Sequence, residues 1–203
     1  MAGGNWLLCA DGEWPPESVW KPLSEGSDVI VGVDGGTDSA RSRKIAVTIA
    51  TGDFDSIIDT EVERIALPNQ NASDLGKTLQ YASEKGAEVV NIVGVEGGEI
   101  DHQLAAFAAL IEAPPELEIY MHMSEHVVMR CLEDLELVLD QGTKLSLFAF
   151  TPCANVSISG VEFPLEDEPL AFSTRGLHNV ALGGPIHIES DGALVVVVSR
   201  EHN

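Results

Sequence analysis

Up to about residue 125, the chain alternates between continuous apolar runs and segments whose apolar residues recur with helical spacing. A strand that is covered on both faces of a parallel sheet is apolar throughout, so these runs predict buried parallel strands. The expected strands cover residues 28–33, 45–50, 64–67, 88–95 and 117–121. Residues 1–28 carry a weaker pattern, which we interpret as a first strand followed by a connection.

Two helices are predicted between these strands. Leu75, Leu79 and Ala82 follow the spacing of one helix face and predict a helix from Ser73 to Lys85. A second helix is expected over residues 101–112. It would face the core with Leu104, Phe107, Ala108 and Ile111. The alternation of strand and helix implies right-handed crossovers and a parallel sheet.

Beyond about residue 125, the pattern changes to short apolar runs separated by Gly and Pro. These runs fall at residues 127–129, 135–139, 144–150, 155–161, 185–189 and 193–198. Runs of this length and spacing indicate antiparallel strands. The predicted fold class is therefore α/β, with an N-terminal Rossmann-like domain built on a parallel sheet (residues 1–125). A C-terminal antiparallel β-sandwich domain is expected to follow (residues 126–203).

Acidic residues follow several of the predicted strands, each beside Gly or a turn. They are Asp34, the pair Asp53 and Asp55, Asp74, and Asp101. In a parallel sheet with right-handed crossovers, the carboxyl ends of the strands lie along one edge, where ligands bind. Acids that are distant in the sequence thus become neighbours in space. The pattern predicts a metal and phosphate site at this edge.

The segment from Gly52 to Ser56 reads Gly-Asp-Phe-Asp-Ser and is the most informative of these positions. In extended backbone, side chains at i and i+2 leave on the same face, so Asp53 and Asp55 can converge on one cation. Gly52 has no Cβ and lets a ligand approach the main chain closely. An isolated Asp-x-Asp would more often be a solvated turn; the other strand-end acids favour the metal site.

The charge balance restricts the partners. Among 203 residues, 11 Lys and Arg face 33 Asp and Glu, which gives a formal net charge of −22. Such a surface repels nucleic acids and anionic membranes, so neither is expected as a partner. A polyphosphate ligand would need a divalent cation held by carboxylates. The three cysteines are far apart and odd in number, and the N-terminus lacks a signal-peptide pattern, so we expect reduced thiols and a cytoplasmic location.

Other site types are disfavoured by their motifs. No Gly-x-x-x-x-Gly-Lys-Ser/Thr occurs, and the glycine pairs do not fit the Gly-x-Gly-x-x-Gly of dinucleotide-binding sites. His122 and His126 have the outer spacing of a zinc-binding helix, but Met123 stands where that motif requires Glu. We interpret the two histidines as surface or core residues.

Four segments in the first half of the chain resemble the thiamin pyrophosphokinase family. The family's Asp-Gly-Gly matches residues 34–36, and its Gly-Asp-Phe-Asp-Ser is identical to residues 52–56. Its Asp-x-Thr-Asp-x-x-Lys-Ala-Leu resembles residues 71–79, and its Gly-Gly-Arg-x-Asp-His resembles residues 97–102. Only the Gly-Asp-Phe-Asp-Ser match is specific by itself, but the order and spacing of all four support the resemblance.

The β-rich half extends the resemblance to about residue 198. The family's Gly-Leu-x-Trp-x-Leu resembles residues 160–165, and its Ser-Asn before a short strand resembles residues 178–179. The chain departs from the family pattern at several matched positions, and four of these departures matter most. Asn71 replaces Asp, Glu99 replaces Arg, Phe163 replaces Trp and His178 replaces Ser. The loss of one acid near the metal and of one base near the phosphates puts full activity in question.

The resemblance implies transfer of a pyrophosphoryl group from ATP to the primary hydroxyl of thiamine, with release of AMP. It further implies Mg²⁺ and ATP at the α/β edge, and a homodimer in which the partner's β-domain helps to hold thiamine. Two alternatives remain open at this point. The acceptor could be another heteroaromatic alcohol, such as a hydroxymethyl pterin, or the chain could bind a ligand without turning it over.

The resemblance also implies roles for individual residues. It assigns the metal to Asp53, Asp55 and Asp74, and the acceptance of the substrate proton to Asp74 or Asp101. Nucleotide binding is assigned to Asp34, Gly35, Gly36, Gly52, Ser56, Lys77 and His102, with Lys77 contacting phosphate. The organic substrate is assigned to Gln70, Ser173, His178 and Asn179. Asp74 also fits a charge at a helix N-terminus, and Lys77 a solvated helix residue.

Overall fold

The computed structural model describes residues 4–52, 62–68 and 71–200. Asp53, Asp55, Ser56 and Gln70 lie outside the described residues. The chain divides into two compact units, Met1–Ser124 and Glu125–Asn203. None of the helices in the described part is long and apolar enough to cross a membrane.

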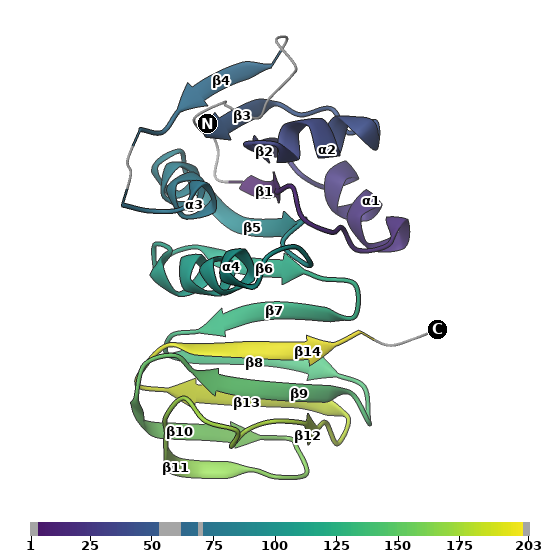
Figure 1. Ribbon diagram of the computed structural model, residues 1–203. Coiled ribbons are helices and arrows are strands. Elements are labelled where there is room, and N and C mark those ends of the chain that lie inside the picture. The colour runs from purple at the N-terminus through teal and green to yellow at the C-terminus, as the bar shows by residue number, and fades with distance from the viewer. Residues whose placement is uncertain (1–3, 53–61, 69–70, 201–203) are drawn as a thin grey trace. The chain divides into compact units, whose positions relative to one another are not determined.

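The described part of the first unit contains a parallel sheet with the strand order β6-β5-β1-β2-β3-β4 (Figure 1). Its strands are β1 (Gly4–Cys9), β2 (Val29–Val33), β3 (Ile49–Gly52), β4 (Glu63–Ala66), β5 (Ala87–Val93) and β6 (Glu118–His122). Its helices are α1 (Glu17–Glu25), α2 (Gly36–Ser42), α3 (Asp74–Glu84) and α4 (Ile100–Glu112). The predicted α/β architecture with a mostly parallel sheet is confirmed.

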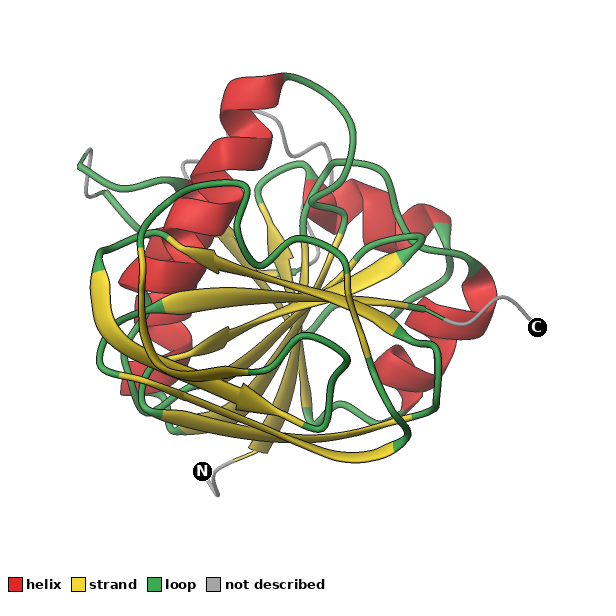
Figure 2. Cartoon of the chain, turned by 90° about the horizontal axis from the view of Figure 1, so that it is seen from below, coloured by secondary structure: helices red, strands yellow, loops and turns green. Residues whose placement is uncertain are grey.

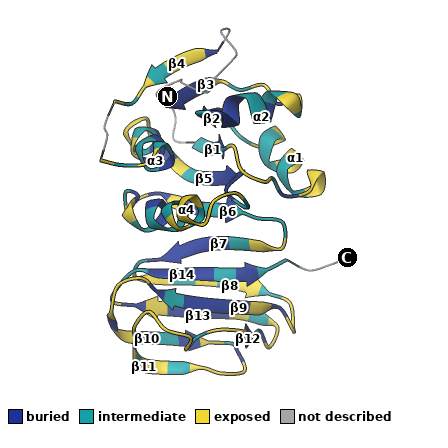
Figure 3. Cartoon of the chain, in the orientation of Figure 1, coloured by how far each residue is buried: buried dark blue, intermediate teal, exposed yellow. Residues whose placement is uncertain are grey.

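Alternate residues of the central strand β1 pack on opposite faces of the sheet, and most residues of β1, β2 and β5 are buried (Figure 3). Leu7 and Cys9 join a core cluster with Ala40 of α2, and α1 packs against the same cluster through Trp20. On the other face, the ring of Trp6 lies 6.3 Å from that of Tyr81 in α3. Helices therefore cover both faces, which explains why these strands are apolar throughout.

The described residues of the second unit form strands and loops, without a helix (Figure 2). One antiparallel sheet has the order β12-β9-β14-β7 and the other the order β11-β10-β13-β8. The strands are β7 (His126–Cys131), β8 (Asp134–Leu139), β9 (Lys144–Ala149), β10 (Cys153–Ser159), β11 (Leu165–Leu170), β12 (Asn179–Val180), β13 (Gly184–Ser190) and β14 (Leu194–Ser199). The predicted antiparallel strands are confirmed, and β11 and β12 are additional.

Three expectations about individual elements are wrong. The predicted strand over residues 45–50 begins only at Ile49, because Lys44 takes a left-handed conformation (φ 63°) and Ile45 turns back to donate to the carbonyl of Ala40. Residues 17–25 form helix α1 where only a connection was predicted, and residues 36–42 form helix α2, for which no element was predicted. Both are short, and Pro22 lies inside α1, where proline disfavours a helix.

The third wrong expectation concerns the inner face of α4. The residues buried there are Ala106, Ala109 and Leu110, whereas Leu104 is 57% exposed. Small residues let α4 approach α3 closely, and Ala109 lies against Gly76. Backbone proximity thus decides which face is inside, and the larger apolar side chains are left more exposed.

Candidate functional site

The carboxyl ends of the parallel strands border a cavity of about 590 Å³, here called the strand-end cavity. It is lined by residues 10–12, 34, 73–75, 94–99, 102, 103, 105 and 106. The neighbouring strands β1 and β5 lead into crossovers toward opposite sides of the sheet. This is the topological switch point, where open α/β sheets bind their ligands.

Asp34 enters this cavity from the turn after β2, in a left-handed conformation (φ 47°) that costs a non-glycine residue about 1–3 kcal/mol. The backbone holds it there: the Asp34 N–H donates to the carbonyl of Thr51 at 2.8 Å, and Thr37 N–H donates to the Asp34 carbonyl at 3.1 Å. Within the described part of the chain, its buried Oδ1 accepts no hydrogen bond. A buried carboxylate oxygen left in this state suits a cation.

Asp74 is the first residue of α3 and also lines the cavity. The hydroxyl of Ser73 caps the helix by accepting the N–H of Gly76 at 3.2 Å. Lys77, one turn later, brings its Nζ to 2.6 Å from Asp74 Oδ1. The contact is electrostatic, because this buried oxygen accepts no hydrogen bond of ordinary geometry. Lys77 therefore contacts the carboxylate that the sequence assigned to a metal.

The loop between β5 and α4 forms another wall. Gly97 and Gly98 both have positive φ angles, 72° and 67°, and Glu99 precedes α4 without capping it through its side chain. The N-terminal N–H groups of α4 therefore have no side-chain cap from Glu99, and groups of this kind bind anions. Asp101 is exposed and its Oδ1 accepts the backbone N–H of His102 at 2.9 Å.

The glycine pair after β2 has a packing role. A Cβ on Gly36 would stand 1.9 Å from the carbonyl oxygen of Cys9, and one on Gly35 would stand 2.7 Å from Asp11 Oδ2. Because the neighbour of Gly36 is main chain, only glycine fits at that position, whereas the Asp11 side chain beside Gly35 could move. Cys9 itself is no nucleophile, because burial raises the pKa of its thiol to about 12 although Arg43 acts in the opposite direction.

The structure places Asp34, Asp74 and His102 on the strand-end cavity, and Gly35, Gly36 and Gly52 beside it. Asp101 is next to a lining residue but does not line the cavity. Asp53, Asp55, Ser56 and Gln70 are outside the described residues, so their assignments remain predictions.

Two cavity carboxylates were missed by the sequence analysis. Asp11 follows β1 and accepts the hydroxyl of Ser39 at 2.6 Å. Glu96 follows β5, and its Oε2 accepts both the N–H (2.8 Å) and the hydroxyl (2.7 Å) of Ser124. The signal was present, because each follows an apolar run and adjoins glycine, as Asp34 does.

The cavity is strongly anionic. Its described lining contains five acids and no Lys or Arg; the acids are Asp11, Asp34, Asp74, Glu96 and Glu99. Among the described residues, however, no three metal-ligating side chains gather closely enough to form a metal cluster. A metal centre here would need ligands from outside those residues, or from the substrate.

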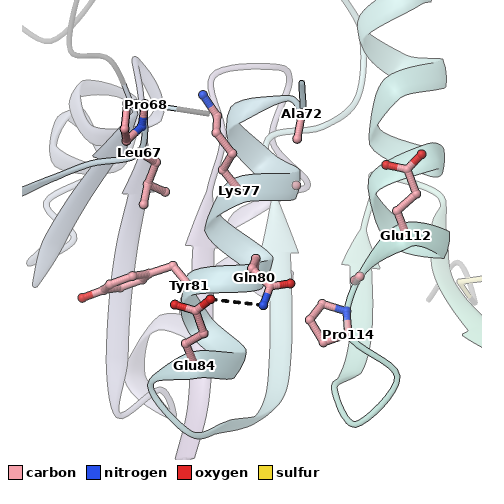
Figure 4. Close-up of a pocket in the computed structure, with 11 residues that line it drawn as sticks. Leu67, Pro68, Ala72, Lys77, Gln80, Tyr81, Glu84, Glu112 and Pro114 are labelled. Atoms are coloured by element: carbon pink, nitrogen blue, oxygen red, sulfur yellow. Dashed lines mark hydrogen bonds between the residues drawn. The ribbon is translucent and has the colours of Figure 1, made fainter. Parts of the chain in front are cut away.

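Lys77 also lines a second cavity of about 370 Å³, here called the α3–α4 cavity (Figure 4). Its wall includes Leu67, Tyr81 and Pro114, and burial together with Glu63 raises the pKa of Tyr81. The strand-end acids are absent from its described lining. The acids of the predicted site that the structure describes therefore lie at or beside the strand-end cavity and not at the α3–α4 cavity.

In the second unit, Asn179 is buried and its amide is engaged with the main chain. Oδ1 accepts the N–H groups of Phe163 (3.1 Å) and Val180 (2.9 Å), and Nδ2 donates to the Phe163 carbonyl at 2.7 Å. Asn179 and Phe163 also line a cavity of about 250 Å³. His178 is exposed with φ 56°, and the exposed Ser173 accepts the N–H of Arg175. Asn179 is thus placed to shape that cavity.

Comparison with known proteins gives a consistent result. The family model "Thiamin pyrophosphokinase, catalytic domain" matches residues 20–121, slightly more than half of the 203 residues. A thiamine pyrophosphokinase of Bacillus subtilis is 27% identical over 150 residues, which cover 68% of this chain and 70% of that protein.

Solved structures show the same fold. The crystal structure of thiamine pyrophosphokinase from Bacillus subtilis aligns with a TM-score of 0.82 at 20% identity, covering 98% of this chain and 100% of that one. The enzyme from Geobacillus thermodenitrificans gives 0.79 at 20% identity, covering 100% and 99%. That from Candida albicans gives 0.79 at 12% identity, covering 97% and 90%. With the match of the catalytic-domain model, these findings show that the chain belongs to the thiamin pyrophosphokinase family.

Proposed function

We propose that this chain transfers the pyrophosphoryl group of ATP to the hydroxyl of thiamine, yielding thiamine diphosphate and AMP. The observation that carries the proposal is the family match over residues 20–121, a segment that contains Asp34, Asp74 and the β5–α4 loop. The comparisons do not favour either alternative, a pterin-like acceptor or a ligand-binding protein without turnover.

Mg²⁺ fits the side chains that are present. Asp34 and Asp74 each offer a buried carboxylate oxygen without a hydrogen bond among the described residues, and Mg²⁺ prefers such oxygen ligands. Asp53 and Asp55 are proposed as further ligands from the sequence alone. Bound Mg²⁺ would supply charge to offset the phosphate oxygens during attack on the β-phosphorus.

The protein's own groups then have to align the reactants. The N–H groups of Gly98 and of the first turn of α4 are proposed to bind phosphate oxygens. Lys77, whose Nζ lies 2.6 Å from Asp74 Oδ1, is proposed to bind a phosphate oxygen. A metal held by Asp74 would weaken the attraction between Lys77 and that carboxylate. Alignment and charge compensation are the main requirements of phosphoryl-group transfer.

The proton of the attacking hydroxyl needs an acceptor, which the sequence assigned to Asp74 or Asp101. Asp74 is engaged with Lys77, whereas Asp101 uses one carboxylate oxygen for the N–H of His102 and has an exposed side chain. We therefore favour Asp101 as the general base. His102, which lines the cavity, is proposed to contact the nucleotide.

The organic substrate and the assembly are proposed from the family resemblance. Residues 1–125 would bind Mg²⁺ and ATP, and residues 126–203 would bind thiamine through Ser173, His178 and the cavity that Asn179 shapes. The working unit is proposed to be a homodimer with shared sites. Two-fold dimers are the commonest oligomers, and sedimentation analysis at micromolar concentration tests this point.

The proposed function is tested by incubating the purified chain with ATP, MgCl₂ and thiamine and separating the products by chromatography. Thiamine diphosphate and AMP are expected in equal amounts. ADP in place of AMP would refute pyrophosphoryl transfer. A panel of heteroaromatic alcohols in the same assay tests the acceptor, since turnover of a pterin but not of thiamine would overturn the assignment. Asp34→Asn, which removes one cavity carboxylate charge, should reduce AMP release.

A further inference from the structure

Two buried threonines connect the end of β3 with the first turn of α3. Thr51 is the residue before Gly52, and Thr78 lies one helical turn after Asp74. Both are fully buried, at 0% exposure. Their hydroxyl oxygens are 2.7 Å apart, although the residues are 27 positions apart in the sequence.

The number of hydroxyl protons gives this contact a direction. The Thr78 hydroxyl lies 2.7 Å from the Asp74 carbonyl, which can only accept, so Thr78 donates its single proton there. Thr51 must then donate to Thr78. The approach of Thr51 to the Gly32 carbonyl is longer, 3.4 Å, and the opposite arrangement would lose one of the two short bonds. A hydrogen-bond chain therefore runs from Thr51 through Thr78 to the backbone of Asp74.

Thr51 also fixes the other cavity acid. Its carbonyl accepts the N–H of Asp34 at 2.8 Å and so holds the strained turn after β2. One residue thus links the backbones of Asp34 and Asp74, whose carboxylates line the strand-end cavity. The side chain of Thr51 holds one acid and its main chain holds the other.

We propose that the Thr51–Thr78 hydroxyl pair is a positioning device that sets the spacing of the Asp34 and Asp74 carboxylates in the strand-end cavity. The inference rests on the proposed function of this cavity. Neither hydroxyl touches the reactants; both act through the backbones of the two acids. An apolar pair would fill the same volume, but it would lack the directed bonds that fix α3 against β3.

The test uses the near-isosteric variants Thr51→Val and Thr78→Val, with Thr51→Ser and Thr78→Ser as conservative rescues. Thr37→Val is the matched control, because Thr37 is equally buried and its hydroxyl has no hydrogen bond within the described part of the chain. Two readouts are measured, kcat for AMP release and the affinity of the nucleotide-free protein for Mn²⁺ alone. Melting temperatures confirm that each variant is folded.

Thr51→Val and Thr78→Val are each expected to lower kcat and Mn²⁺ affinity by about tenfold, as loss of a positioning contact does, with little change in KM for thiamine. The control Thr37→Val should leave both readouts at the wild-type level. The serine variants should restore both kcat and Mn²⁺ affinity. The double variant Thr51→Val/Thr78→Val should lose no more kcat or Mn²⁺ affinity than either single valine variant, because all three break the same hydrogen-bond chain. Wild-type readouts in folded Thr51→Val and Thr78→Val, losses that serine does not restore, or an equal loss in Thr37→Val would overturn the proposal. If the wild type releases no AMP, the proposed function fails, while Mn²⁺ affinity still tests the positioning.

Discussion

Replacing Lys77 by Met should strengthen metal binding and weaken nucleotide binding at the same time. Lys77 Nζ is 2.6 Å from Asp74 Oδ1, and the side chains are only 10% and 33% exposed. In the free protein the ammonium therefore occupies the position that a metal needs. Met keeps the length of the side chain, and with it the wall of the α3–α4 cavity, but removes the charge.

The size of the effect follows from the geometry. At an effective dielectric constant near 20, charges at the 2.6 Å separation of Lys77 and Asp74 attract by about 6 kcal/mol before desolvation is subtracted. Desolvation, together with screening of the partly exposed Asp74, leaves a net value of about 1–3 kcal/mol. Without the lysine, Mn²⁺ should bind about 5- to 150-fold more tightly. KM for ATP should rise by about 10- to 100-fold, because a charge-assisted contact to phosphate is lost.

The assay combines calorimetric titration of the nucleotide-free protein with Mn²⁺ and steady-state AMP release over a range of ATP concentrations. Lys77→Arg should retain most of the wild-type behaviour in both measurements. Lys85→Met is the matched control, because it removes one charge from the end of the same helix, where Lys85 lies 5.5 Å above the Tyr81 ring. Unchanged or weaker Mn²⁺ binding in Lys77→Met would refute the exchange between ammonium and metal.

Two further predictions concern the β-rich unit. Asn179→Ala removes the three hydrogen bonds to Phe163 and Val180 and should lower the free energy of unfolding, measured by urea titration, by about 1–3 kcal/mol. Asn155→Ala, at an exposed position, should have a smaller effect on this free energy. Equal effects of the two substitutions would contradict the prediction. The backbone N–H of Asn155, followed by its side chain, lowers the pKa of Asp191 in the folded protein. The ionised Asp191 therefore stabilises the fold above its ordinary pKa near 3.9, and this stabilisation is lost as the pH falls through the lower pKa of the folded state. The drop in melting temperature from pH 6 to pH 2 should therefore be smaller in Asp191→Asn, and an unchanged drop would contradict the assignment.

The α/β architecture could be predicted because strands buried on both faces leave an unmistakable apolar run, as in residues 29–33 and 87–93. Helix α3 was equally clear, since Ser73 caps its first turn and Gly86 follows its end with a positive φ of 85°. The short helices α1 and α2 were not predicted, because α1 contains Pro22 and α2 has only seven residues. The inner face of α4 was misjudged because close approach to α3 selects Ala109 over a larger side chain such as Leu104.

The sequence predicts some of the acids that line the site, but not the contacts that these acids make. The rule that strand ends share one edge correctly brings Asp34 and Asp74 to one cavity. It cannot reveal that Lys77 turns onto Asp74, because the helix position of Lys77 also allows a solvated side chain. Asp11 was not predicted because the strand pattern of residues 1–28 is weak, so the end of β1 could not be located. The assignment of Gly35 and Gly36 to the nucleotide stays a prediction, and the distance to the Cys9 carbonyl shows that Gly36 is also required by the fold.

The distribution of charge bears on how the nucleotide would bind. The chain has 11 Lys and Arg, and none of them is among the described residues that line the strand-end cavity, where five acids gather. The potential there is negative, so a free polyphosphate is repelled until cations reduce it. Lys77 cannot perform this task in the free protein, because its charge is committed to Asp74. We infer that a divalent cation held by these acids would be needed for the nucleotide to bind. A cation on Asp74 would weaken the hold of that carboxylate on Lys77, and the charge of Lys77 would then be available to the phosphates.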